Sequence, residues 1–225
     1  MKFKNKKVLI TGATSGIGYA VSKLLAQNGA QVFCFDQKIP RKQIIGVKYF
    51  KVDITNSGQI KRALIKVGAP IDILINNAGI MRRGDIFSTS EKDFDLLFDI
   101  NTKGCWLMLK YTKPYLARKA TILQMSSRHG LYHPVDPAIY ALTKSAVLYL
   151  AEILRKTCPK YNVKIACPGS TDTPLSCYGI TGKALKKKKK GMKSPEFLAE
   201  KIVELLKSKK DYLIFDQKKR GYYFE

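Results

Sequence analysis

Tyr140 and Lys144, in the stretch YALTKSA over residues 140–146, are four residues apart, and Ser127 precedes the tyrosine by thirteen. On a helix, a spacing of four places two side chains on one face, within about 6 Å of each other. A free tyrosine has a pKa near ~10, and a nearby ammonium lowers that pKa because it favours the phenolate. The pair is therefore a candidate for moving a proton to or from an alcohol or ketone. The alternative is a helix that carries both residues by chance.

A glycine-rich turn, TGATSGIG over residues 11–18, follows a short apolar segment and precedes an amphipathic one. Gly12, Gly16 and Gly18 allow the backbone to approach a pyrophosphate, which the N-terminus of a helix favours. Asp36 ends the next apolar segment, where a carboxylate accepts hydrogen bonds from an adenosine ribose and repels a 2′-phosphate. These features predict NAD as the cofactor. NADP is the alternative, because two basic residues follow Asp36 within five positions.

Short β-branched segments alternate with longer amphipathic ones, which is typical of a parallel sheet built from strand–helix–strand units. Strands are expected at residues 7–11, 31–36, 47–52, 71–76, 120–125, 160–166 and 212–215. Helices are expected at residues 16–28, 59–67, 92–117, 138–157 and 195–208. Only ten residues separate Asp36 from Val47, so the helix between the second and third strands should be reduced or missing.

The composition fits one soluble globular domain over residues 1–225, with 45% apolar and 26% charged residues. No apolar segment reaches the ~18 residues of a membrane-spanning helix, and the N-terminal apolar stretch is too short for a signal peptide. Five cysteines without a C-x-x-C pair favour a reducing compartment. We therefore expect a cytoplasmic protein without a membrane partner. We expect no metal, because His129 and His133 lack further ligands at the spacing that zinc prefers.

The net charge of +24 points to nucleic acid as a second class of partner, because clustered lysines and arginines neutralise phosphates. The basic residues are spread along the chain, however, and no DNA- or RNA-reading motif accompanies them. Specific nucleic-acid binding is therefore not expected.

A Pro-Gly pair, Pro168-Gly169, follows the sixth expected strand, and polar motifs follow the fourth and fifth, namely Asn76-Asn77-Ala78-Gly79 and Ser126-Ser127. They should lie at the carboxyl edge of the sheet, where open α/β folds bind ligands. With the TGxxxGIG turn, Asn101 and the Tyr-x-x-x-Lys pair, they occur in an order and spacing that resembles the classical short-chain dehydrogenase/reductase family. The resemblance runs from about residue 4 to the last strand.

The resemblance implies a Rossmann-type α/β fold: a doubly wound, seven-stranded parallel sheet with helices on both faces. It implies that Tyr140 is the acid/base and that Lys144 lowers its pKa and holds the nicotinamide ribose. Ser127 would bind the substrate oxygen, and Asn101 would hold a water that relays protons. The cofactor-binding residues would be Gly12, Ser15, Gly16, Ile17, Gly18, Asp36, Asp53, Ile54, Asn77, Ala78, Gly79, Tyr140, Lys144, Pro168, Gly169, Thr171 and Thr173. Asp53 would meet the adenine, and Thr171 stands where the family usually has a valine.

The expected function is therefore NAD(P)-dependent hydride transfer between the cofactor and a secondary alcohol or ketone. Two alternatives stay open. One is a redox sensor or nucleic-acid-associated regulator that binds a dinucleotide without turnover. The other is the epimerase or dehydratase chemistry of extended relatives.

The substrate pocket is expected between residues 80–85, 128–136 and a lid segment, residues 174–193. Arg82, Arg83, Arg128 and a run of lysines lie in these segments, which suggests either an anionic substrate or solvated charges. The resemblance also implies a homodimer or homotetramer that pairs through helices at 94–117 and 138–157. Leu142, Val147, Leu150 and Leu154 would supply its apolar contacts.

Overall fold

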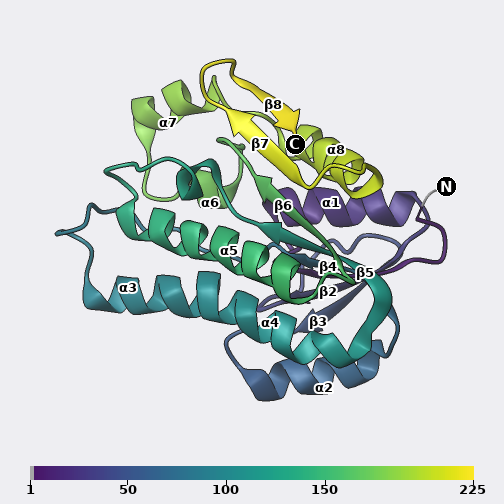
Figure 1. Ribbon diagram of the computed structural model, residues 1–225. Helices are drawn as coiled ribbons and strands as arrows, with labels where there is room; N and C mark the ends of the chain where they lie inside the picture. The colour runs from purple at the N-terminus through teal and green to yellow at the C-terminus, as the bar shows by residue number, and fades with distance from the viewer. Residues whose placement is uncertain (1–2) are drawn as a thin grey trace.

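Eight strands form one sheet among residues 3–225, the part of the chain that the computed structural model describes (Figure 1). Their order is β3-β2-β1-β4-β5-β6-β7-β8, and all neighbours are parallel except β7 and β8. The strands are β1 (Lys7–Thr11), β2 (Gln31–Asp36), β3 (Val47–Lys51), β4 (Ile71–Asn76), β5 (Leu116–Met125), β6 (Asn162–Cys167), β7 (Tyr212–Asp216) and β8 (Gly221–Phe224). This confirms the doubly wound α/β fold.

The strand β8 corrects the expected number of seven parallel strands. It returns antiparallel to β7 after a short turn, in which a carboxylate oxygen of Asp216 accepts hydrogen bonds from the backbone N–H groups of Lys218 and Lys219 at 2.8 and 3.0 Å. An aspartate that caps the following N–H groups stabilises a tight turn. The added strand covers the outer edge of β7.

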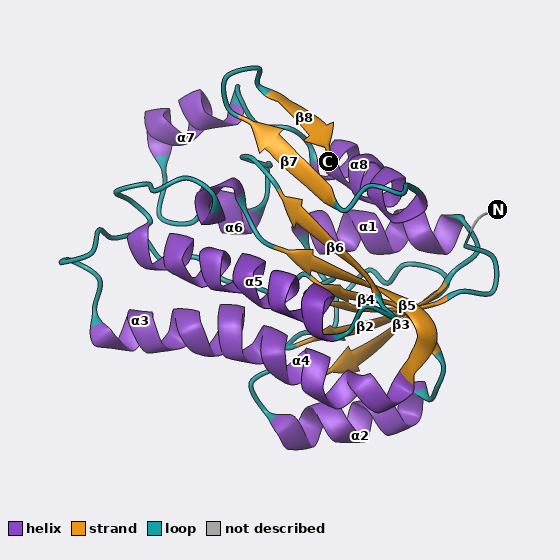
Figure 2. Ribbon diagram, viewed as in Figure 1, coloured by secondary structure: helices purple, strands orange, loops and turns teal. Residues whose placement is uncertain are grey.

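Helices cover both faces of the sheet, as Figure 2 shows. Along β1, Val8 and Ile10 pack into the cluster beneath α1 and α8, whereas Leu9 packs into the opposite cluster with α2, α4 and α5. This alternation is the period of two that a strand requires, and both faces are apolar because both are covered. The main helices are α1 (Gly16–Gln27), α2 (Ser57–Val67), α3 (Glu91–Phe98), α4 (Cys105–Thr112), α5 (Ala138–Thr157) and α8 (Pro195–Lys207).

The helix expected at 92–117 is interrupted. Between α3 and α4, residues Asp99–Gly104 form a π-helical segment, and a 3₁₀ turn at Lys113–Tyr115 leads directly into β5. The expectation was wrong at its end, since Leu116 and Ala117 belong to β5, where Leu116 pairs with Ile71. π-helical segments disturb the regular period of a helix and are frequent at functional sites. This one contains Asn101.

The connection between β2 and β3, residues 37–46, is fully described and contains no helix, as expected from its length. Several expected strand boundaries shift: β3 ends at Lys51, β5 begins at Leu116, β6 spans Asn162–Cys167, and β7 ends at Asp216.

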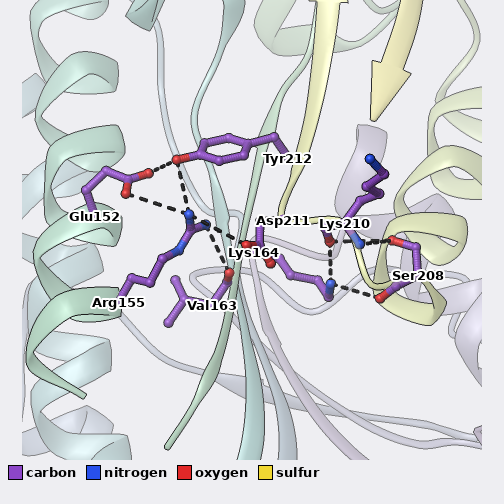
Figure 3. A network of polar contacts seen from close by, with 8 residues as sticks. All are labelled: Glu152, Arg155, Val163, Lys164, Ser208, Lys210, Asp211 and Tyr212. Atoms are coloured by element: carbon purple, nitrogen blue, oxygen red, sulfur yellow. Dashed lines mark hydrogen bonds and ion pairs between the residues drawn. The ribbon is translucent and has the colours of Figure 1, made fainter. Parts of the chain in front are cut away.

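A polar network fastens the last part of the sheet (Figure 3). Lys164 on β6 is fully buried, and its ammonium donates to the carbonyl oxygens of Ser208, at 3.1 Å, and Lys210 after α8. Arg155 on α5 donates to the Val163 carbonyl at 3.2 Å and to the Tyr212 hydroxyl at 3.3 Å. The network therefore joins α5, β6, β7 and the end of α8. A buried cation is tolerated where such acceptors surround it.

Candidate active site

A cavity of about 530 Å³ opens at the carboxyl edge of the sheet, where β1, β2, β4, β5 and β6 end. It brings together most of the residues singled out from the sequence: Gly12, Ser15, Gly16, Ile17, Gly18, Asp36, Ile54, Asn77, Ala78, Gly79, Ser127, Tyr140, Lys144, Pro168, Gly169, Thr171 and Thr173. Asp53 and Asn101 are not among the described residues that line it.

The glycine turn has the backbone geometry that its sequence predicts. Gly12 and Gly16 have positive φ angles, 67° and 55°, which residues other than glycine rarely adopt. A Cβ on Gly12 would lie 2.7 Å from the Cα of Ala78, so this turn and the end of β4 approach too closely for any larger residue. Asn77 holds the two segments together, because its amide nitrogen donates to the carbonyl oxygens of Thr11 and Gly12 at 3.0 and 2.8 Å.

The N-terminus of α1 faces the cavity. Its N-cap, Ser15, makes no side-chain cap hydrogen bond with the described residues, and the first turn carries no acidic side chain. The first N–H groups of a helix lack partners within the helix, and they attract an anion. The start of α1 is therefore suited to a phosphate group.

Asp36 lines the same end of the cavity. One of its carboxylate oxygens accepts hydrogen bonds from the N–H of Thr14 at 3.1 Å and from the Thr14 hydroxyl at 2.8 Å. Its other oxygen accepts from the N–H of Lys38 at 3.3 Å. Thr14 also lines the cavity, and the sequence reasoning missed it because threonine at a variable position of the turn carries no specific signal.

Asp53 is not among the described residues that line the cavity. One of its carboxylate oxygens accepts from both the N–H and the hydroxyl of Thr55 at 2.8 Å, so the carboxylate closes the local turn before α2. Its neighbours Val52 and Ile54 reach the cavity instead. The adenine contact expected for Asp53 stays a prediction.

Asn101 is buried, with 1% of its surface exposed, and its amide is fully engaged. Its oxygen accepts from the Ile80 N–H at 2.8 Å, and its nitrogen donates to the Ile80 carbonyl and the Thr143 hydroxyl, both at 3.0 Å. In this arrangement the side chain positions the loop after β4 against α5. It does not face the cavity.

Ser127, Tyr140 and Lys144 lie together at the other end of the cavity and are buried, with exposed fractions of 8%, 5% and 4%. The ammonium of Lys144 lies 5.8 Å from the centre of the Tyr140 ring and donates to the Met125 carbonyl at 2.9 Å. The helix spacing of four therefore does place both groups on one face.

The two pKa shifts in this cluster are caused mainly by burial. Burial raises the pKa of Tyr140 to about 12, although a hydrogen bond with the Ser127 side chain opposes the rise. Burial lowers the pKa of Lys144 to about 8. The direction for Tyr140 is opposite to the lowering expected from its neighbour, because the Lys144 ammonium is directed to a carbonyl and desolvation of the phenolate dominates.

The neighbouring serine is used differently. Both serines line the cavity, but Ser126 donates its hydroxyl to the backbone carbonyl of Lys144 at 2.7 Å, whereas the Ser127 oxygen accepts from the His129 N–H at 3.2 Å. Gly130, which the sequence reasoning missed, makes this packing possible. A Cβ there would lie 2.7 Å from the Ser126 hydroxyl and 2.8 Å from the Lys144 carbonyl oxygen.

The turn after β6 is supported by the unexpected strand. Gly169 donates its N–H to the Tyr222 hydroxyl of β8 at 3.1 Å, and a Cβ on Gly169 would lie 2.6 Å from the Phe215 ring. Thr173 then caps the short helix α6 (Pro174–Cys177), since its hydroxyl oxygen accepts from the Ser176 N–H at 3.2 Å. The strands β7 and β8 thus position the Pro-Gly turn.

The lid segment begins after β6, and its last residue, Lys193, lies beside the residues that precede its start. It contains α6 and a helix α7 (Gly182–Lys189), and its base is closed by backbone hydrogen bonds. Asp172 donates its N–H to the Lys193 carbonyl at 2.9 Å, and Lys193 donates to the Ser170 carbonyl at 3.2 Å.

Known proteins resemble this chain along most of its length. The short chain dehydrogenase family matches residues 6–178. An uncharacterized oxidoreductase of Thermotoga maritima is 30% identical over 224 residues, covering 93% of this chain and 86% of the relative. The 3-oxoacyl-[acyl-carrier-protein] reductase of the same organism is 31% identical over 196 residues, covering 78% of each chain.

The solved structure of Thermoplasma acidophilum aldohexose dehydrogenase, in ligand-free form, superposes with a TM-score of 0.80 at 26% identity. The alignment covers 91% of this chain and 88% of that one. A doubly wound sheet with a glycine turn at its carboxyl edge defines a nucleotide-binding protein of Rossmann type. The chain belongs to the short-chain dehydrogenase/reductase family.

Proposed function

We propose that the protein transfers a hydride between a nicotinamide dinucleotide and a secondary alcohol or ketone, with NAD as the preferred cofactor. The observation that carries this proposal is one continuous cavity. Its first end has the glycine turn, the free start of α1 and Asp36, and its second end has Ser127, Tyr140 and Lys144. These groups fit a dinucleotide that lies along the sheet edge, with phosphates at α1 and the ribose of its adenosine at Asp36.

The bound nicotinamide would supply the hydride chemistry. The chain's own residues bind and move the proton. Because the pKa of Tyr140 is raised to about 12, the phenol is protonated at neutral pH and is ready to donate its proton to a ketone oxygen. Ser127 would hold that oxygen through its hydroxyl. Lys144 would hold a ribose hydroxyl and stabilise the phenolate that forms.

The direct test is an assay of NADH absorbance with a panel of secondary alcohols and ketones. We expect NADH to be consumed with at least one ketone, and NAD to be reduced with the matching alcohol. A folded protein that binds NADH yet exchanges hydride with no member of a broad panel would contradict the proposal.

The choice of NAD leads to a prediction at Asp36. Replacing Asp36 with serine removes the carboxylate that would repel a 2′-phosphate, so we expect the ratio of kcat/KM for NADPH to kcat/KM for NADH to rise roughly 10- to 100-fold. Asp53→Asn is the matched control, because the Asp53 carboxylate is held by Thr55 outside the cavity. An unchanged ratio in Asp36→Ser would remove the basis for NAD preference.

We also propose that two copies of the chain pair through α3–α4 and α5. Large apolar side chains remain exposed there: Phe94 41%, Trp106 44%, Leu142 49%, Tyr149 73% and Ile153 50%. Exposed apolar side chains gathered on neighbouring helices are typical of a subunit contact. Of the residues expected to supply this contact, Val147 is only 2% exposed, and Leu150 and Leu154 pack against the core, so only Leu142 is available.

For this interface we expect the double variant Tyr149→Lys, Ile153→Lys to halve the particle mass measured by light scattering, because it places two charges in the contact. Ile45→Lys is the control, since Ile45 is 97% exposed in the connection between β2 and β3. An unchanged mass in the double variant, or a monomeric starting protein, would refute pairing through α5.

The five cysteines, Cys34, Cys105, Cys158, Cys167 and Cys177, are free thiols. This supports our proposal of a reducing, cytoplasmic location. Among the described helices, none has the length and apolar character needed to cross a membrane.

A further inference from the structure

Three cations from separate segments converge on the end of the cavity that holds Tyr140. Arg83 follows β4, Arg128 follows β5, and Lys188 lies in α7 of the lid segment. All three line the cavity together with Ser127 and Tyr140. A carboxylate, Asp136, lies among them and pairs with Arg83 at 3.3 Å. Three positive charges and one negative charge leave this end of the cavity with a net positive charge.

Arg128 differs from Arg82 and Arg83, which are both paired with carboxylates in the described part of the chain. Within residues 3–225, the half-buried Arg128 guanidinium has no hydrogen bond or ion pair. Arg82, in contrast, pairs with Asp93 at 3.1 Å, lies over the Tyr178 ring, and does not line the cavity where the described residues form it. A guanidinium offers a planar set of donors that matches a carboxylate or a phosphate.

The lysine run shows the same selectivity. Of residues 186–190, Lys188 alone is half-buried and lines the cavity, and its ammonium donates to the Ser176 carbonyl. The other four lysines are exposed. Lys188 is therefore the member of the run that α7 turns towards the two arginines.

The charges are close enough to influence one another. Burial lowers the pKa of His129, the charges of Arg128, Arg83 and Lys188 lower it further while Asp136 opposes them, and together they bring it to about 4. The His129 ring lies 6.1 Å from the Tyr140 ring, edge to face. His129 is therefore neutral at pH 7. Because its ring lies next to that of Tyr140, the same three positive charges also act near the Tyr140 hydroxyl.

We infer that the substrate is an alcohol or ketone that carries a carboxylate or a phosphate, which Arg128, Lys188 and Arg83 bind while Tyr140 and Ser127 address its oxygen. The inference rests on the proposed function for the reacting end of the substrate. The overall charge of +24 would add long-range attraction for such an anion.

Matched substrate pairs test the inference. One arm compares a keto acid with its methyl ester, and the other compares a phosphorylated hydroxyketone with the free compound. We expect kcat/KM to favour the anion in one arm by about 10-fold or more, and to fall by about 10- to 100-fold in Arg128→Gln and Lys188→Met for that anion only. The arm that responds distinguishes carboxylate from phosphate. Lys187→Met, on an exposed lysine of the same helix, is the control and should match the unmodified enzyme.

Equal kcat/KM for charged and neutral partners in both arms would overturn the inference. The inference would also be overturned if the variants lost kcat/KM equally for the charged and the neutral substrate, or if they bound NADH more weakly. The cations would then support the fold or cofactor binding.

Binding is measured separately from turnover, by titrating inorganic phosphate and acetate into the NADH complex and following NADH fluorescence. We expect at least one anion to bind, and Arg128→Gln to weaken it by about tenfold or more. Absence of anion binding would refute the inference even if neutral ketones are reduced. Anion binding without any turnover would refute the proposed function and leave the anion site standing.

Discussion

Replacing Tyr140 with phenylalanine is expected to lower kcat by about 10²- to 10⁴-fold, which is the usual contribution of a positioned acid or base. The substitution removes only the hydroxyl. The ring would keep its packing with Met81, Leu97 and Ile139, so the fold and the affinity for NADH should be retained. Measurements of kcat with the best ketone and of the Kd for NADH separate these effects.

Tyr149→Phe is the matched control for this experiment. Tyr149 lies on the same helix, but it is 73% exposed and should lose no activity when its hydroxyl is removed. If Tyr140→Phe turned over ketones at the original rate, Tyr140 would not be the acid/base. If the unmodified protein bound NADH tightly and neither protein turned over any ketone, a dinucleotide sensor would be the better description.

Replacing Lys144 with methionine is expected to have opposite effects on activity and stability. The activity should fall by about 10²-fold or more, because the phenolate of Tyr140 loses its neighbouring charge. The free energy of unfolding at pH 7 should rise by about 1–3 kcal/mol, because a buried ammonium is disfavoured and methionine fills a similar volume. The loss of the hydrogen bond to the Met125 carbonyl offsets part of this gain.

The stability effect of Lys144 should depend on pH, in a direction that its lowered pKa determines. Burial lowers the pKa of Lys144 from 10.5 to about 8, so between these pH values the unfolded chain retains a proton that the folded chain has lost. The contribution of Lys144 to the free energy of unfolding therefore increases as the pH rises from about 8 to 10.5. When the pH is lowered through the same window, this contribution decreases. Urea unfolding from pH 7 to 10 should show this slope in the original protein and a flatter one in Lys144→Met. A variant that is less stable at pH 7 and keeps the full slope would show that the lysine stabilises the fold.

Much of the fold was predictable because strand and helix periods dominate the sequence. Segments that are apolar throughout, such as Val8-Leu9-Ile10, indicated a sheet covered on both faces. The two apolar clusters do lie on the two faces of the sheet. The strand β8 was missed because the segment 221–224 is only four residues long and shows no alternation of apolar and polar residues. It forms a strand because it pairs with the edge of β7. The π-helical segment was missed because the apolar period of residues 92–117 does not show where the backbone hydrogen bonds change; within it, Asn101 contacts Ile80, which is far from it in the sequence.

Within the site, sequence spacing predicted which residues come to the sheet edge but not what their side chains bind. The glycine turn and the Ser127, Tyr140 and Lys144 cluster lie together, because strand ends and a helix period determine their positions. The orientation of Asp53 depends on Thr55, which competes for its carboxylate locally. The raised pKa of Tyr140 depends on burial by residues from several segments, which no local pattern indicates.

The closed base of the lid segment has a consequence for engineering. Since Ser170, Asp172 and Lys193 already join its two ends, residues between them form an excursion whose length is nearly independent of the sheet. Outside α6 and α7, where the chain is irregular, doubling the length of a flexible loop costs only about 0.6 kcal/mol in closure entropy. Replacing the segment with that of another member of the short-chain dehydrogenase/reductase family, with the base residues retained, should therefore change the substrate preference and leave the sheet intact.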